Sequence, residues 1–140
     1  MVQLIVGKKG KGKTKQVLDM VNKEVKSASG NIVYLDKNLS HMYELNNKIR
    51  LINVADYAVG NPDEFVGFIR GIISQDNDLE QMYFDSFLKI ACLEGSDRIE
   101  EIVQKLDSIS ETYHFKIIAS VSLDNSELAE SLKSKVIVSL

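Results

Sequence analysis

The chain has 140 residues, of which 44% are hydrophobic and 26% charged, so it can bury the core of one globular domain and is not disordered in composition. A formal net charge of −3 argues against a general nucleic-acid-binding protein, and a single cysteine excludes an internal disulfide and a cysteine-based zinc site. No apolar stretch reaches membrane-spanning length and no signal peptide is recognisable, so we expect a cytoplasmic protein without membrane insertion, with residues 1–140 forming one domain.

The first segment of the chain combines a strand pattern, a loop pattern and a helix pattern. Residues 1–6 form a short apolar run typical of a buried parallel strand. Residues 7–14 then read Gly-Lys-Lys-Gly-Lys-Gly-Lys-Thr, which fits the phosphate-binding pattern G-x-x-x-x-G-K-[ST] without a mismatch. Beyond Lys13, apolar residues recur at helical spacing, namely Val17, Leu18, Val21 and Val25.

The residue types of this loop suit a phosphate site. Glycines at positions 7, 10 and 12 allow close backbone approach, and free amides at a helix start attract anions. We expect Lys13 to reach the β- and γ-phosphates of a nucleotide and the Thr14 hydroxyl to ligate Mg²⁺. The other lysines add positive charge, with only one or two facing the ligand: Lys8, Lys9, Lys11 and Lys15. The alternative is a surface turn rich in glycine and lysine.

Strands and helices alternate along the next part of the chain. Residues 27–30 end the first helix, and residues 31–35 predict a second strand that ends at Asp36. Residues 50–54 predict a third strand. Asn61 suits the N-cap of a helix with Pro62 in its first turn and Glu64 at the third position.

The second half continues the alternation. Residues 74–81 are polar and predict a surface connection, and residues 82–84 predict a fourth strand. Residues 87–93 predict a short helix or turn, after which Ser96 suits the cap of a longer helix. Its expected inward face is Ile99, Ile102, Val103, Leu106, Ile109 and Tyr113. The remaining predicted elements are a strand at 115–121, a short helix at 126–134 and a strand at 136–138. This order predicts an α/β fold, a three-layer sandwich around a mostly parallel sheet of about five to six strands.

Three strand ends carry side chains suited to a nucleotide site. Asp85 follows the apolar residues 82–84, and a carboxylate at that place can hold Mg²⁺; the alternative is a cap of the next segment. Asp36 ends the second strand and could orient water, bind Mg²⁺ indirectly or only start a loop. Ser120 and Ser122, near the end of the fifth strand, could hydrogen-bond the γ-phosphate or serve only as turn formers.

The two histidines show no metal-ligand spacing. His41 and His114 are far apart in the sequence. We expect His114 to be structural, at a junction between a helix and a strand. We expect His41 to lie near the edge of the loop with a solvated role.

In order, these motifs resemble the P-loop NTPase superfamily, and within it the RecA-like ATPase cores. The resemblance rests on the loop at residues 7–14, then Asp36, Asp85 and Ser120 at strand ends. It implies that the strand at 115–121 lies between the first and the fourth strand. The chain is also similar to small stand-alone ATP-binding proteins of Firmicutes that are sometimes labelled as relatives of twitching-motility (PilT-like) ATPases.

The resemblance implies an ATP-binding protein with Mg²⁺, in which Lys13, Asp36, Asp85 and Ser120 are the candidate catalytic residues. RecA-type ATPases carry a catalytic glutamate where this chain has Asn38, and an amide is no general base. We therefore expect a weak or partner-activated Mg²⁺-dependent ATPase, whose partner is another protein or a second copy.

Two alternatives to this function stay open. One is a non-catalytic nucleotide-binding scaffold. The other is a kinase, which lacks support because the arginines, at positions 50, 70 and 98, are not clustered. A contact of the loop lysines with nucleic acid is not expected but is left open.

Overall fold

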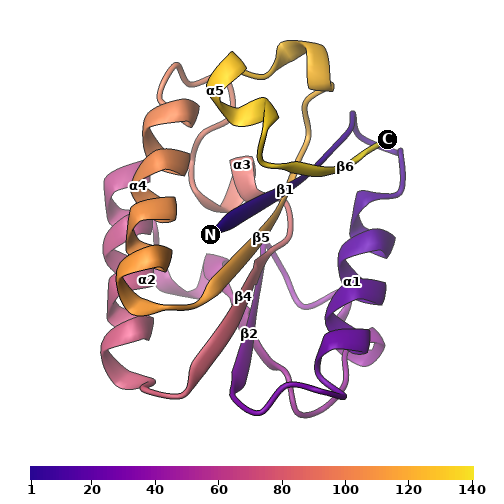
Figure 1. The fold of residues 1–140 in the computed structure, drawn as a ribbon, viewed down its shortest axis with the longest axis vertical. Coiled ribbons are helices and arrows are strands. Elements are labelled where there is room, and N and C mark those ends of the chain that lie inside the picture. The colour runs from indigo at the N-terminus through magenta and orange to yellow at the C-terminus, as the bar shows by residue number, and fades with distance from the viewer.

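The computed structural model describes all residues from 1 to 140 and arranges them in three layers, a central sheet with helices on both faces (Figure 1). The strands are β1 Val2–Val6, β2 Asn31–Asp36, β3 Arg50–Asn53, β4 Leu79–Phe84, β5 Lys116–Val121 and β6 Val136–Ser139. The helices are α1 Lys13–Glu24, α2 Pro62–Gln75, α3 Phe87–Ile90, α4 Ile99–Tyr113 and α5 Glu130–Lys133. Three short 3₁₀ turns complete the list, η1 Met42–Glu44, η2 Val54–Tyr57 and η3 Asn125–Glu127.

The sheet has six strands in the order β3-β2-β4-β5-β1-β6, and every neighbouring pair is parallel. Parallel neighbours need a crossover connection, which the alternation of helices and strands along the chain supplies. The α/β class and the three-layer arrangement are therefore confirmed. The predicted place of the fifth strand is also correct, because β5 lies between β1 and β4.

The two faces of the sheet bury different residues of the same strands. Ile5 of β1 packs with Val17 and Val21 of α1 on one face, whereas Leu4 and Val6 join the larger core on the other face. This alternation follows from the two-residue period of a strand. Helices α2 and α4 cover that second face, opposite α1 (Figure 1). No helix of the structure combines the length and the hydrophobicity that crossing a membrane requires.

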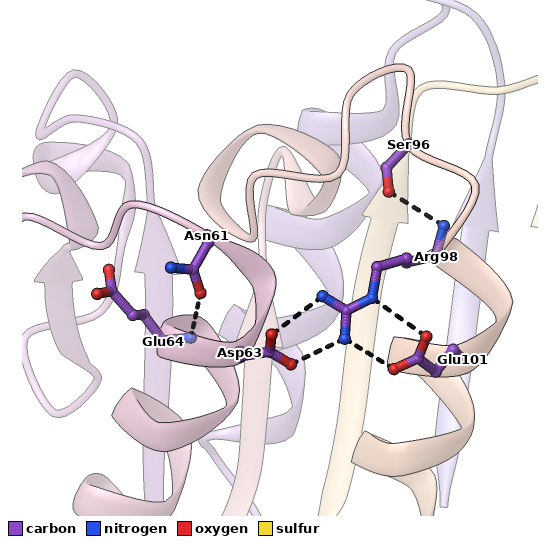
Figure 2. A network of polar contacts seen from close by, with 6 residues as sticks. All are labelled: Asn61, Asp63, Glu64, Ser96, Arg98 and Glu101. Carbon is purple, nitrogen blue, oxygen red and sulfur yellow. Dashed lines mark hydrogen bonds and ion pairs between the residues drawn. The ribbon is translucent and has the colours of Figure 1, made fainter.

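The first turns of α2 and α4 are joined by Arg98 (Figure 2). Its guanidinium donates to both carboxylate oxygens of Asp63, at 2.8 and 3.1 Å, and to both of Glu101, at 2.7 and 3.1 Å. The predicted cap of α2 is confirmed beside it, because the Asn61 side chain accepts a hydrogen bond from the Glu64 amide at 2.9 Å. The Asn61 contact thus caps the start of α2, and the Arg98 contacts link the first turns of the two helices.

The expected surface connection at residues 74–81 is wrong. Helix α2 continues to Gln75, and β4 already begins at Leu79. Leu79 pairs with Asn31 of β2 and is only 9% exposed. Gln81 is buried as well and accepts a hydrogen bond from the Tyr83 hydroxyl at 2.6 Å. Gln81 can be buried in β4 because its side chain is hydrogen-bonded. A search for apolar residues alone therefore does not recognise this part of the strand.

The expected start and inward face of the long helix after Ser96 also need correction. Helix α4 begins at Ile99, and Ser96 does not cap it, because its hydroxyl accepts from the Arg98 amide two residues ahead at 3.0 Å. Tyr113 is 57% exposed at the last turn, where His114 takes a left-handed conformation and ends the helix. The short helix expected at 126–134 is two separate turns, η3 and α5.

Candidate functional site

The glycine loop (residues 7–12) leaves the carboxyl end of β1 and enters α1 through two left-handed glycines. Gly10 and Gly12 have φ values of 82° and 91°, a region that favours glycine. The amides of Gly10, Gly12, Lys13 and Thr14 donate no hydrogen bond to another protein atom. Helix α1 has neither a side-chain cap nor an acidic residue in its first turn. Free donors and the positive end of the helix dipole therefore coincide at this loop.

The base of the glycine loop is held by its neighbours in the sheet. The Gly7 amide donates to the Leu123 carbonyl at 2.9 Å, and the Leu140 amide donates to the Val6 carbonyl at 2.9 Å. A side chain at position 7 would meet Leu140, whose Cβ lies 3.1 Å from the place of a Cβ on Gly7. The first glycine thus allows close packing of the loop against Leu140.

The free amides border a cavity of about 560 Å³ at the carboxyl edge of the sheet, which we call the edge cavity. This volume is in the range of pockets that hold small ligands. Its lining contains four lysines, two carboxylates and one hydrophobic side chain: Lys9, Gly10, Gly12, Lys13, Thr14, Lys37, Asp85, Ser86, Leu88, Lys89, Glu94 and Ser122. An excess of positive charge in a polar pocket suits an anionic ligand.

Lys13 is the buried lysine of the edge cavity. Its side chain is 8% exposed by area, and its ammonium donates to the Lys8 carbonyl at 3.1 Å. Burial lowers the pKa of Lys13; the negative charge of Asp85 opposes this shift, and the positive charge of Lys9 adds to it. An ammonium with only a carbonyl partner has further donors available for an anion.

Asp85 stands at the end of β4 and collects three hydroxyl donors. One carboxylate oxygen accepts from the Thr14 hydroxyl at 3.2 Å and the Ser120 hydroxyl at 2.9 Å, and the other from the Tyr34 hydroxyl at 3.0 Å. Burial, together with the charge of Asp85, raises the pKa of Tyr34, which therefore stays a donor. The Ser86 amide donates to the Ser120 hydroxyl at 2.9 Å, which fixes that hydroxyl toward the carboxylate.

Asp36 is a second buried carboxylate beside Asp85, but it does not line the edge cavity. One of its oxygens accepts from the Lys37 amide at 2.7 Å, and the other, Oδ2, is buried without any hydrogen-bond partner. Burial first, and then the charge of Asp85, raise the pKa of Asp36 to about 6, against the lowering effect of the Lys37 amide.

The structure thus brings together part of the residues expected from the sequence. Lys9, Lys13, Thr14, Asp85 and Ser122 all border the edge cavity. Three expected lysines do not, namely Lys8, Lys11 and Lys15. Lys15 instead pairs with the Asp19 carboxylate at 3.2 Å on the outer face of α1. Ser120 acts behind the cavity wall, through its bond to Asp85.

Sequence reasoning missed Lys37, Lys89 and Glu94 as cavity residues. All three lie on segments that follow a strand, the connections where parallel sheets place their ligands. Lys37 comes directly after Asp36, and the other two follow β4 beyond Asp85. The rule for parallel sheets could therefore have pointed to these connections, although not to the individual side chains. His41 was also missed as a neighbour of the two aspartates; its ring comes close to both carboxylates.

No protein-family model matches the chain, and no curated protein matches it.

Proposed function

We propose that the chain binds a nucleoside triphosphate, ATP with Mg²⁺, in the edge cavity, as a RecA-like member of the P-loop NTPases. The observation that carries the proposal is the junction of the glycine loop with α1, where the cavity-lining residues Gly10, Gly12, Lys13 and Thr14 keep their amides free. Backbone amides in this arrangement are suited to phosphate oxygens. Three of these residues, Gly12, Lys13 and Thr14, are the last three of the motif G-x-x-x-x-G-K-[ST].

In this proposal the polar groups around the cavity bind the phosphates, hold the metal ion or position another side chain. The loop amides and Lys13 bind the phosphates, with Lys9, Lys37 and Lys89 adding positive charge around them. Thr14 and Asp85 would hold Mg²⁺, and their hydroxyl and carboxylate, 3.2 Å apart, are oxygen donors of the kind that this ion prefers. A Mg²⁺ ion held there would neutralise part of the negative charge of the phosphates. Ser120 and Tyr34 position the Asp85 carboxylate.

We propose that any hydrolysis is slow or depends on a partner. Asn38 is exposed, and its side-chain oxygen accepts from the Ser40 amide at 3.0 Å, so it contributes no base. Besides Asp85, the cavity lining holds one carboxylate, Glu94. Asp36 lies outside this lining, and a role for it in orienting water stays a hypothesis. A partner protein or a second copy could supply the missing groups.

The same observations favour a second candidate, a nucleotide-binding module without catalysis. The absence of a base at position 38 is the specific support for it. A kinase receives less support, because phosphoryl transfer draws on arginines near the phosphates. None of the three arginines lines the edge cavity, and Arg98 is held by Asp63 and Glu101 (Figure 2).

Titration calorimetry with ATP and Mg²⁺ tests the proposal. We expect the wild-type chain to bind ATP and Lys13→Ala to weaken binding by about 10- to 100-fold, the loss of a charged hydrogen bond in a buried site. Lys15→Ala is the matched control, since Lys15 comes two residues after Lys13 in the same segment but pairs with Asp19 outside the cavity. A wild-type chain that binds no nucleoside triphosphate contradicts the proposal.

Turnover separates the two candidate functions. Steady-state phosphate release by the wild-type chain is compared with that of Asp85→Asn, which keeps the shape of the side chain and removes its charge. Release by the wild type that the variant loses supports an ATPase. No release by either chain, with ATP still bound, supports the non-catalytic module.

A further inference from the structure

Three side chains that could ligate a metal converge behind the wall of the edge cavity. One oxygen each of Asp36 and Asp85 and one ring nitrogen of His41 lie within 4.8 Å of one another. Asp36 ends β2, Asp85 follows β4, and β2 and β4 are neighbours in the sheet. His41 reaches the pair from the connection just before η1. Of the three, only Asp85 also lines the edge cavity.

The buried oxygen of Asp36 is the observation that points to a ligand. Asp36 is 1% exposed, and its Oδ2 has no hydrogen-bond partner; it is the only buried side-chain nitrogen or oxygen atom of the chain in that state. Nearly all buried polar atoms in proteins have a partner, so such an atom requires an explanation. A cation held between the carboxylates would provide it.

The two carboxylates of the cluster have no direct ion-pair partner in the protein. Neither Asp36 nor Asp85 forms an ion pair with a lysine, an arginine or the amino terminus. The donors to Asp85 are neutral hydroxyls, those of Thr14, Ser120 and Tyr34. These bonds orient the carboxylate and leave lone pairs for a further partner.

His41 has the second partner that metal-bound histidines characteristically have. Its Nδ1 lies 2.6 Å from a carboxylate oxygen of Glu44. A carboxylate on one ring nitrogen fixes the tautomer and orients the other nitrogen toward a metal. Glu44 sits one turn along, in η1, so the local fold of residues 41–44 presents the ring.

We propose that Asp36, His41 and Asp85 bind a divalent transition-metal ion, with Glu44 positioning the histidine. Two carboxylates and an imidazole form a mixed oxygen and nitrogen donor set, which favours ions such as Zn²⁺, Fe²⁺, Co²⁺ or Mn²⁺ over Mg²⁺. Three protein ligands leave further positions for solvent. The site requires no phosphate, so it goes beyond the proposed nucleotide site, from which it differs in every ligand except Asp85.

Titration of the full chain with Co²⁺, after removal of metals with a chelator and without nucleotide, tests this site. We expect one Co²⁺ per chain, detected by its visible absorption and by calorimetry. His41→Asn and Asp36→Asn should each weaken binding by about tenfold or more. His114→Asn is the matched control, because His114 is the other histidine and its left-handed φ of 59° suits asparagine.

Paramagnetic NMR identifies the ligand directly, since bound Co²⁺ should shift the ring protons of one of the two histidines, His41, and leave His114 in place. Absence of Co²⁺ binding, or equal affinity of His41→Asn and His114→Asn, overturns the proposal. Circular dichroism of each variant shows that a lost site is not a lost fold. A chain that binds Co²⁺ but no ATP supports this metal site and contradicts the proposed function. A chain that binds ATP but no Co²⁺ supports the proposed function and overturns the metal site.

Discussion

At the scale of single residues, Asp36 is a carboxyl group that the fold buries at an electrostatic cost. Its carboxyl is buried beside Asp85, and these two causes raise its pKa to about 6 from an ordinary value of 3.8. The native state therefore binds the Asp36 proton more tightly than the unfolded chain does. The free energy of unfolding consequently falls as the pH rises from about 4 to about 6.

We expect Asp36→Asn to remove this pH dependence. In chelated protein at about pH 8, the variant should be more stable than the wild type by up to about 3 kcal/mol, since each pKa unit corresponds to about 1.4 kcal/mol. Near pH 4, where Asp36 is protonated in the native state, the two chains should unfold at similar urea concentrations. Urea denaturation across this range measures the difference, and a gap that does not change with pH would mean that Asp36 titrates normally.

The sequence identifies individual residues of the candidate site only where a motif or a strand end marks them. Lys13 and Thr14 follow from the motif, and Asp85 from its place after an apolar strand; all three line the edge cavity. His41 carries no such mark, because the approach of its ring to two aspartates depends on how residues 37–41 fold back. The unpaired oxygen of Asp36 is likewise a property of packing, which no pattern of residue types contains.

At the scale of elements, the glycine loop and helix α1 form one unit whose geometry depends on Gly12. Its φ of 91° lies in a region that other residues rarely adopt, although nothing lies within 4 Å of the place of a Cβ. Any cost of a side chain there therefore comes from backbone conformation and not from a clash. The same residue opens the first turn of α1, so its conformation also sets the direction of the free amides.

Gly12→Ala should lower the free energy of unfolding by about 1 to 3 kcal/mol and weaken ATP binding. The matched control is Gly67→Ala in the interior of α2, where the place of a Cβ is equally open and φ is not positive. There alanine should stabilise the chain by up to about 1 kcal/mol, because it is the better helix former. Chemical denaturation of both variants checks the contrast, and equal effects would contradict this account of the loop.

The predicted elements are correct where the residue types alone indicate the local structure. They are wrong where the structure depends on which hydrogen bonds the polar side chains form. The cap of α2 follows from the residue types of Asn61 and Pro62, and the structure confirms it. The residue types do not predict the start of β4, because it includes Gln81, a polar residue that is buried with a hydrogen bond from Tyr83. Likewise, Ser96 has the residue type of a cap but bonds to the Arg98 amide before the helix begins.

At the scale of the whole molecule, positive charge is concentrated at the edge cavity while the net charge is −3. Lys8 and Lys11 are exposed on the glycine loop and do not line the cavity. A nucleic acid contacting them would gain few phosphate contacts and would meet the surplus negative charge of the remaining surface.

We therefore expect no measurable binding of a labelled single-stranded oligonucleotide at about 0.15 M salt, where surface charges are screened beyond about 8 Å. Fluorescence anisotropy under the conditions of the ATP titration provides the measurement. Binding that persists at this salt and is weakened by Lys8→Ala or Lys11→Ala would add nucleic acid to the partners of this chain.

The order of the strands also determines when, during synthesis on a ribosome, the glycine loop acquires its support. Of the six strands of this sheet, β1 is translated first, whereas its two neighbours, β5 and β6, are translated last. The acceptors of the Gly7 amide, on Val121 and Leu123, emerge equally late. A nascent chain therefore carries the loop motif without these partners while β2, β3 and β4 are synthesised. Competence to hold a ligand at this loop thus depends on segments that are made more than a hundred residues after the loop itself.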